Sequence, residues 1–205
     1  MTKIKLCGLK RACDIEWANV LKPDYIGFVF AKQSRRYVSP NDAGELKKLL
    51  HPSIKVAGVF VNAEIEAIAN MVELNIIDVV QLHGSEDEAY LRRLRERINV
   101  SIFQAFCIKT KEDVKRAEES SADTVLLDAG AGCGDVFDWS LLKDINRPYF
   151  LAGGLTTENV ADAIDRLHPY GVDVSSALET DGMKDSVKMA AFVKAARGKE
   201  HDNGR

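Results

Sequence analysis

Residues 171–177 read GVDVSSA, a short apolar segment that ends in two serines. It is the last of eight such segments, most of them rich in Val, Ile and Phe, as buried strands are. Eight similar units fit a closed barrel of parallel strands better than an open sheet. An open, doubly wound sheet remains an alternative, but it explains the eighth unit less well. The other segments are KIKLCG from Lys3, DYIGFVF from Asp24, KVAGVFV from Lys55, DVVQLHG from Asp78, VSIFQAF from Val100, DTVLLDA from Asp123 and PYFLAGG from Pro148.

The segments start 21 to 31 residues apart, which leaves room for a helix and two loops in each unit. Apolar residues recur between them at the spacing of one helix face that covers a sheet, as in Ile65, Ile68, Ala69 and Val72. Two helix starts are indicated by Ser39 before Pro40 and by the capping-box spacing of Ser85 and Glu88. We predict an α/β fold, a single (β/α)8 barrel of eight parallel strands over residues 1–197, with a polar, disordered tail over 198–205.

The composition excludes several classes of protein. The chain has 205 residues, 28 basic and 31 acidic, with a formal net charge of -3 and no block of like charge, so neither a nucleic-acid nor a membrane partner is indicated. It shows no long apolar span and no signal-peptide pattern, so a cytoplasmic location is expected. The four cysteines form no CxxC pair, and no His, Cys, Asp and Glu set has the spacing of a metal site.

Candidate functional residues lie where the predicted strands end, because barrels of this class carry their active groups there. Cys7 ends the first strand and Asp128 the sixth. A thiol and a carboxyl group on opposite sides of a barrel could act as base and acid on a small substrate. The competing interpretation of Cys7 is strong, since free cysteines are usually buried and inert. A carboxyl group that follows Val125-Leu126-Leu127 is harder to dismiss, because burying it is costly unless it is paired or functional.

Other strand ends offer groups for binding. Gly153-Gly154 follow the seventh strand, and Ser175-Ser176 follow the eighth. Backbone N–H groups of these loops, with a short helix that starts near Ser176, predict a phosphate site, although the glycines could simply make a tight turn. Arg35 and Arg36 follow the second strand, where one of them could hold a carboxylate or both could face solvent. Gln81 and His83 end the fourth strand, where a histidine is more often structural than a ligand.

Seven ordered motifs, spread from Lys3 to about Ala195, resemble the phosphoribosylanthranilate isomerase family. Any one of them alone would be weak, but their order makes the match specific. They are KLCG from Lys5, SRRYVSP from Ser34, GVFVN from Gly58, VQLHG from Val80, LDA from Leu127 with FDW from Phe137, LAGGL from Leu151, and DVSSALE from Asp173 with GMKD from Gly182.

The resemblance implies a TIM barrel and a cofactor-free aldose–ketose isomerase of tryptophan biosynthesis. The expected reaction is an Amadori rearrangement of N-(5-phosphoribosyl)anthranilate to 1-(2-carboxyphenylamino)-1-deoxyribulose 5-phosphate. By position, Cys7 matches the general base, Asp128 the general acid and Arg36 the residue that holds the substrate carboxylate. Gln81 and His83 are expected to contact the substrate, and the loops of Gly153, Gly154, Ser175 and Ser176 its phosphate. A monomer without metal is expected.

The chemistry asks for opposite pKa shifts at the two catalytic groups. An acid that works near pH 7 needs a raised pKa at Asp128, and a base needs a lowered pKa at Cys7. Lys5 is not an obvious source of that lowering, because alternation points it the same way as Cys7 only if no bulge intervenes.

The sequence departs from the family at two places, Ala131-Gly132-Cys133-Gly134 and Ala177. Two rival functions also stay open. One is a histidine-pathway isomerase, which uses paired aspartates and is disfavoured by Cys7. The other is a catalytically silent barrel that binds an anthranilate-like ligand or a protein.

Overall fold

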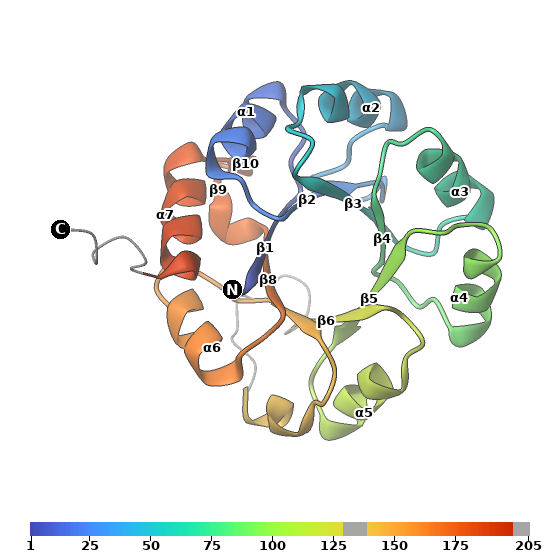
Figure 1. Ribbon diagram of the computed structural model, residues 1–205, viewed down its shortest axis with the longest axis vertical. Helices are drawn as coiled ribbons and strands as arrows, with labels where there is room; N and C mark the ends of the chain where they lie inside the picture. The colour runs from blue at the N-terminus through green and yellow to red at the C-terminus, as the bar shows by residue number, and fades with distance from the viewer. Residues whose placement is uncertain (129–138, 199–205) are drawn as a thin grey trace.

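The computed structural model describes residues 1–128 and 139–198, and within them eight parallel strands close into a barrel. Figure 1 looks along this barrel and shows the helices as a ring around it. The prediction of a (β/α)8 TIM barrel is confirmed, and the open sheet is wrong. The strands are β1 (Lys3–Cys7), β2 (Tyr25–Val29), β3 (Lys55–Phe60), β4 (Val79–Leu82), β5 (Ser101–Cys107), β6 (Thr124–Asp128), β7 (Tyr149–Ala152) and β8 (Gly171–Val174).

Seven α-helices lie among the described residues. Between β6 and β7 the described part of the chain holds a short 3-10 helix, η1 (Trp139–Asp144). After β8 come a 3-10 turn, η2 (Ser176–Leu178), and a small antiparallel ribbon of β9 (Glu179–Thr180) and β10 (Met183–Lys184). The α-helices are α1 (Ala12–Leu21), α2 (Pro40–Leu49), α3 (Ile65–Glu73), α4 (Glu88–Arg95), α5 (Lys111–Glu119), α6 (Val160–Leu167) and α7 (Ser186–Arg197).

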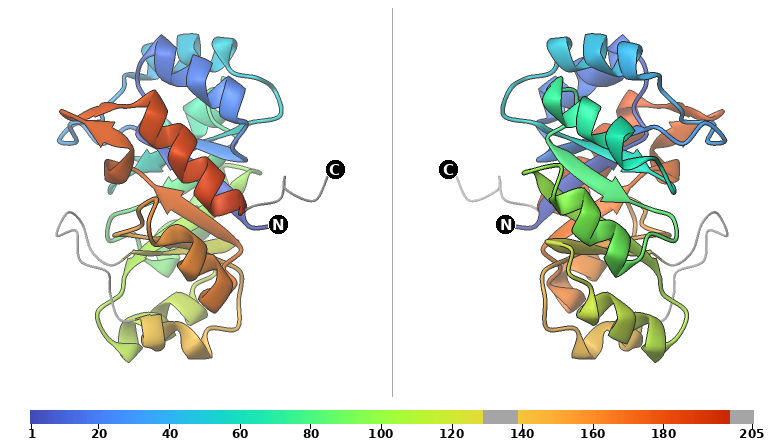
Figure 2. Two further views of the ribbon diagram at one scale, coloured as in Figure 1. Left: turned by 90° about the vertical axis from the view of Figure 1, so that its left-hand side faces the viewer. Right: turned by 90° about the vertical axis from the view of Figure 1, so that its right-hand side faces the viewer.

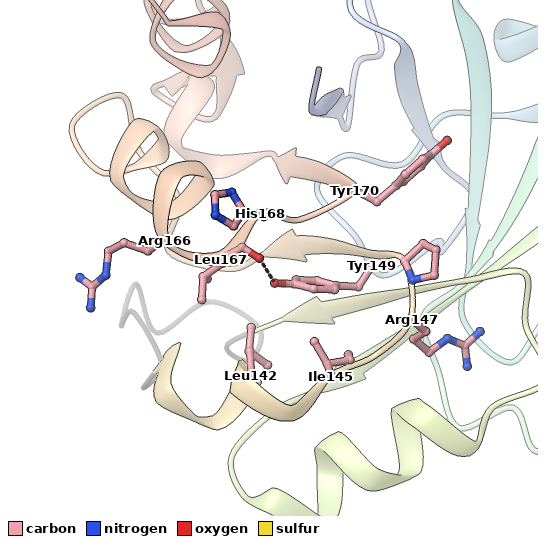
Figure 3. A pocket seen from close by; sticks show the side chains of 9 residues that line it. Leu142, Ile145, Arg147, Tyr149, Arg166, Leu167, His168 and Tyr170 are labelled. Atoms are coloured by element: carbon pink, nitrogen blue, oxygen red, sulfur yellow. Dashed lines mark hydrogen bonds between the residues drawn. The ribbon is translucent and has the colours of Figure 1, made fainter.

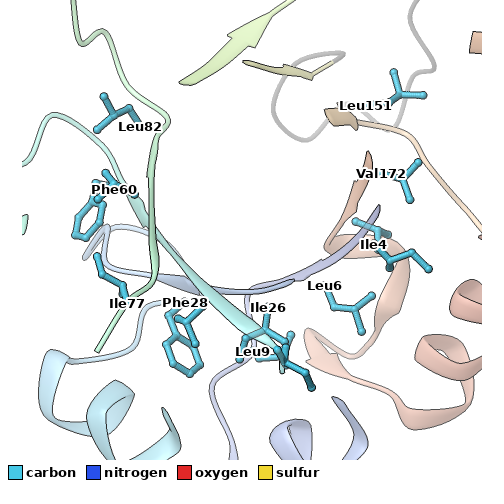
Figure 4. Packing of buried hydrophobic residues seen from close by; sticks show 14 of the residues in the cluster. Ile4, Leu6, Leu9, Ile26, Phe28, Phe60, Ile77, Leu82, Leu151 and Val172 are labelled. Atoms are coloured by element: carbon cyan, nitrogen blue, oxygen red, sulfur yellow. The ribbon is translucent and has the colours of Figure 1, made fainter. Parts of the chain in front are cut away.

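Alternation along the strands divides the core into two parts. In β1, Ile4 and Leu6 join the large cluster between strands and helices, part of which is drawn in Figure 4. Lys5 and Cys7 alternate with them and therefore point to the inside of the barrel. The interior of the barrel toward the N-terminal ends of the strands is aromatic and aliphatic. There Tyr25, Phe103 and Phe150 are in mutual contact at ring-centroid distances of 5.3 to 5.7 Å.

Strand closure brings distant parts of the sequence together. Strands β1 and β8 pair in parallel, with Lys5 opposite Asp173 and Leu6 opposite Val174. All eight strands therefore finish at one end of the barrel, which we call the C-terminal rim. Figure 2 shows that the N-terminus lies at the opposite end from the β9–β10 ribbon. Residues that end different strands thus become neighbours at the rim, as the candidate site requires.

Local signals at the helix starts were partly right. Ser39 caps α2 by accepting a hydrogen bond from the Asp42 N–H group, with Pro40 in the first turn, as predicted. The capping box at Ser85 is wrong, because α4 begins later and Asp87 caps it by accepting from the Tyr90 N–H group. The predicted tail over 198–205 lies almost wholly outside the described residues. Within the described ranges, none of the helices is long and apolar enough to cross a membrane.

Candidate active site

Cys7 ends β1 with its thiol inside the barrel. It is 7% exposed and packs with Val29 and Val59. Gly27, its register partner on β2, makes room for the sulfur, because a Cβ there would lie 2.6 Å from Cys7 Sγ. The thiol thus has aliphatic neighbours on one side, and its charge depends on the polar groups on the other.

Lys5 lies two residues before Cys7 and points to the same side of β1. Its side chain is fully buried, and Nζ donates a hydrogen bond of 3.0 Å to Asp173 Oδ1 on β8. Burial works to lower the pKa of Lys5, but Asp173 and Cys7 raise it, and the net pKa lies above the usual value. Lys5 is therefore a permanent positive charge beside the thiol, which the sequence had not indicated.

The expected low pKa of Cys7 is wrong for the protein without substrate. Burial raises the pKa of the thiol, and Asp173 adds to this. The ammonium groups of Lys5 and Lys184 lower it, but the net pKa remains above the usual value. The described residues therefore hold Cys7 as a thiol at neutral pH while placing two cations where they would stabilise a thiolate.

Asp128 ends β6 and faces the fourth strand. The Nε2 atom of His83, just beyond β4, lies 3.7 Å from Asp128 Oδ2. On its other side, His83 Nδ1 lies 3.2 Å from Gln81 Nε2. Three predicted residues from two strands are thus brought together.

Gln81 carries an unusual feature. The residue is 1% exposed, and its buried Oε1 has no hydrogen-bond partner among the described residues. Buried polar atoms nearly always have partners, so this oxygen is a position where a donor from a ligand would be stabilised.

Arg36 is not directed to open solvent. Its Nε and Nη2 atoms donate to the two carboxylate oxygens of Glu179, at 2.6 and 3.1 Å. Lys184 Nζ donates to the same carboxylate at 2.9 Å, and Arg35 Nη2 donates to it at 2.7 Å. We call Arg35, Arg36, Glu179 and Lys184 the Glu179 cluster. Sequence reasoning missed Glu179 and Lys184, although both stand in the motifs after the eighth strand.

The two loops predicted to bind phosphate follow β7 and β8. Gly153 and Gly154 adopt φ values of 77° and 66°, a region that favours glycine. Ser176 begins η2, a single 3-10 turn, at the place where a short helix is predicted. Ser175 is more engaged than predicted, because its hydroxyl donates to the Cys7 carbonyl at 3.0 Å and accepts from Lys184 Nζ at 3.3 Å. Ala177 lies within η2, whereas Ala131–Gly134 lie outside the described residues.

A hollow at the other end of the barrel has a different character (Figure 3). Its walls are the start of β7 and the end of α6, where Tyr149 donates to the Leu167 carbonyl at 3.0 Å. Arg147 donates from Nη1 to the carbonyls of Ala117, Glu118 and Ser120, at 2.7 to 3.2 Å. These groups join elements of the fold, so the C-terminal rim remains the candidate active site.

The sequence model of the N-(5'phosphoribosyl)anthranilate (PRA) isomerase family matches residues 4–195. The chain belongs to this family. A family member from Endomicrobium trichonymphae is 46% identical over 202 residues, covering 96% of this chain and 99% of its own. A member from Thermoanaerobacter sp. strain X514 is 43% identical, with 97% and 99% covered. The chain is accordingly an isomerase of tryptophan biosynthesis, which decides against the two rival functions.

Solved structures of the family agree with the fold. Phosphoribosylanthranilate isomerase from Thermotoga maritima superposes with a TM-score of 0.88 at 36% identity, covering 96% of this chain and 99% of the other. Another solved member holds reduced 1-(o-carboxyphenylamino)-1-deoxyribulose 5-phosphate and gives a TM-score of 0.86. A further Thermotoga maritima structure is described as monomers generated from a dimeric isomerase, so the expectation of a monomer stays a prediction here.

Proposed function

We propose that this chain performs the Amadori rearrangement of N-(5-phosphoribosyl)anthranilate, with Asp128 as general acid and Cys7 as general base. One observation carries the proposal. Cys7 is the last residue of β1 and Asp128 is the last residue of β6, and at both positions the side chain faces the inside of the barrel at the same rim. Two cations lie near the Cys7 thiol, and a ring nitrogen of His83 faces Asp128.

The first step opens the sugar ring. The carboxyl group of Asp128 gives its proton to the furanose ring oxygen, the bond from that oxygen to C1′ breaks, and the nitrogen lone pair forms the C1′=N bond. The imidazole ring of His83, whose Nε2 atom lies 3.7 Å from Asp128 Oδ2, then faces the carboxylate that results. For this step Asp128 needs a raised pKa, which stays a prediction.

The second step moves the proton of C2′. Once Cys7 has lost its own proton to solvent, its thiolate takes the C2′ proton, the electron pair forms the C1′=C2′ bond, and the iminium nitrogen becomes the amine of an enolamine. Proton transfer to C1′ and from the C2′ hydroxyl then gives the ketone. The imine itself acidifies the C2′ proton, so we expect no metal or organic cofactor. The carboxylate and phosphate groups of the substrate are negatively charged and need cations near them. The positive charges of Lys5 and Lys184 also favour the thiolate form of Cys7.

The remaining rim residues would bind the substrate. Arg36 would hold the anthranilate carboxylate, and the loops of Gly153-Gly154 and Ser175-Ser176 would surround the phosphate. Gln81 and His83 would contact the sugar, since Gln81 Oε1 lacks a donor among the described residues. We also propose that the chain acts as a monomer in the cytoplasm.

Fluorescence of the anthranilate group follows turnover directly. Cys7→Ala and Asp128→Ala are expected to lose about 10²- to 10⁴-fold in kcat, the usual contribution of a general acid or base. Both variants should still bind the reduced product analogue. Cys13→Ala on α1 and Asp162→Ala on α6 are matched controls that remove the same groups from helices outside the barrel. Full turnover by Asp128→Ala or Cys7→Ala would remove that residue from the mechanism.

A further inference from the structure

We propose that Glu179 is a positioning residue for substrate recognition: it holds Arg36 by one edge of the guanidinium group and so presents the other edge to the substrate carboxylate. This inference deepens the proposed function and rests on it, because it takes Arg36 as the carboxylate-binding residue. It assigns a purpose to a buried carboxylate that the reaction itself does not use.

The contact geometry carries the argument. A guanidinium group has two forks, one formed by Nε with Nη2 and the other by Nη1 with Nη2. Glu179 occupies the first fork with both oxygens, at 2.6 and 3.1 Å. Nη1 has no partner in the part of the chain that the structure describes, so the second fork is open to a carboxylate. Such two-point pairing is what Arg offers to a planar anion.

The stem of Arg36 is fixed as well. Gly8 follows Cys7 and has a φ of +81°, and a Cβ on it would lie 2.4 Å from Arg36 Cδ. The arginine therefore crosses the backbone directly beside the candidate base. With stem and first fork both held, the second fork has one orientation relative to Cys7.

Glu179 is itself held in place. Its side chain is 5% exposed, and Lys184, which binds it, also donates to the Ser175 carbonyl at 2.8 Å. Burial works to raise the pKa of Glu179, but Arg36 and Lys184 lower it, and the net pKa is below the usual value. Glu179 is thus a charged anchor that joins Arg36 to the loop of the predicted phosphate site.

An alternative role for Glu179 is to occupy the carboxylate-binding position on Arg36 until the substrate carboxylate displaces it. Displacement would leave a nearly buried carboxylate to find new partners, at considerable cost in free energy. Because Lys184 and Arg35 hold Glu179 in addition to Arg36, we favour an anchor that stays in place when substrate binds.

Two ligands separate these roles by calorimetry. One is reduced 1-(2-carboxyphenylamino)-1-deoxyribulose 5-phosphate, and the other is the same compound without the ring carboxyl group. The chain with Glu179 intact should prefer the first. In Glu179→Gln, this preference should fall about tenfold to a hundredfold, as expected when a clamp is misplaced by roughly an ångström, while the affinity for the second ligand is kept. The KM of the substrate should rise by more than kcat falls.

Glu66→Gln is the matched control. Glu66 accepts from Nε and Nη2 of Arg97 in the same two-point manner, at 2.9 and 2.7 Å, on the outer helix α3. Its ligand preference should be unchanged. If Glu179→Gln does not fold, Glu179→Asp serves instead, because a carboxylate one methylene shorter keeps the charge but not the two-point contact, and it too should lose the preference.

Three results would overturn the inference. An equal loss of affinity for both ligands in the Glu179 variants would make the residue merely structural. An unchanged preference would show that Glu179 does not position Arg36. Tighter binding of the carboxylated ligand would make Glu179 a competitor of the substrate. By contrast, no preference in the unmodified chain would reject the proposed role of Arg36 itself, and no binding of either ligand would reject the proposed function.

Discussion

At the C-terminal rim of the barrel Lys5 and Glu179 pair with other charged side chains, whereas at the opposite end Arg147 and Tyr149 donate to backbone carbonyl groups. Lys5 pairs with Asp173, and Glu179 pairs with Arg36. Arg147 and Tyr149 instead satisfy carbonyls at the ends of α5 and α6. A side chain that donates its hydrogen bonds to backbone carbonyl groups serves the stability of the fold. A charged side chain that is paired with another charge and still has unused donors can also interact with a ligand. Changes at the rim should therefore affect activity, and changes at the opposite end should affect stability.

Among the changes that test this comparison, the largest effect is expected at Gly8, beside the stem of Arg36. Gly8→Ala would place a methyl group 2.4 Å from Arg36 Cδ, at a φ of +81°. Because the Arg36 side chain must move, kcat/KM should fall by about a hundredfold. Gly182→Ala is the matched control, since Gly182 has a φ of +76° but nothing within 4 Å of its added Cβ. Steady-state kinetics on both variants measures the difference, and equal losses would show that backbone strain alone is responsible.

The next effect concerns the opposite end and should appear in stability alone. Arg147→Met removes the donors to two carbonyl groups in the last turn of α5 and to that of Ser120, which directly follows it. We expect a loss of about 2 kcal/mol in the free energy of unfolding, since unsatisfied carbonyls are costly. Urea denaturation measures this loss, and kcat/KM should be unchanged below the transition. A clear fall in kcat/KM would remove the distinction between the two ends.

The influence of Lys5 on Cys7 can be tested through the pH dependence of kcat/KM. Lys5 lowers the pKa of Cys7, so Lys5→Met should raise that pKa and shift the rise of kcat/KM to higher pH. A shift of one unit would lower kcat/KM about tenfold at a fixed pH below the transition. Asp173 acts in the opposite sense, so Asp173→Asn should shift the profile to lower pH.

Lys3→Met is the control for Lys5, because Lys3 lies on the same strand with a side chain that is 43% exposed. Its pH profile should match that of the unmodified chain. Profiles of Lys5→Met and Asp173→Asn that both coincide with it would show that these charges do not govern the thiol.

Tyr149→Phe should give the smallest effect. Burial raises the pKa of Tyr149 to about 12, so its hydroxyl stays protonated and donates to the Leu167 carbonyl. Loss of this one hydrogen bond should cost about 1 kcal/mol in the free energy of unfolding, with kinetics unchanged. Denaturation and turnover on the same preparation check both parts, and a kinetic effect larger than twofold would contradict the assignment of this end to the fold.

The sequence predicted the positions of the strand ends because alternation and the buried runs are local features. Cys7 and Asp128 were placed at the ends of β1 and β6 correctly for that reason. The pairing of Lys5 with Asp173 was out of reach, because it depends on how β8 closes onto β1. The Glu179 cluster depends in the same way on the β9–β10 ribbon, which local patterns did not indicate.

The pKa of Cys7 was predicted with the wrong sign because the requirement of the chemistry was taken as a property of the free protein. Burial within the barrel outweighs the nearby cations, and burial is a tertiary quantity. The capping box at Ser85 failed for a related reason, since Asp87 is a competing cap two residues further along.

Alkylation of Cys7 tests the central claim most directly. Turnover is followed while iodoacetamide reacts, and the modified thiols are located by mass spectrometry of peptides. If Cys7 is the base, loss of turnover should match modification of Cys7 one for one, and the reduced product analogue should slow both. Full turnover by protein whose Cys7 is completely modified would contradict the account.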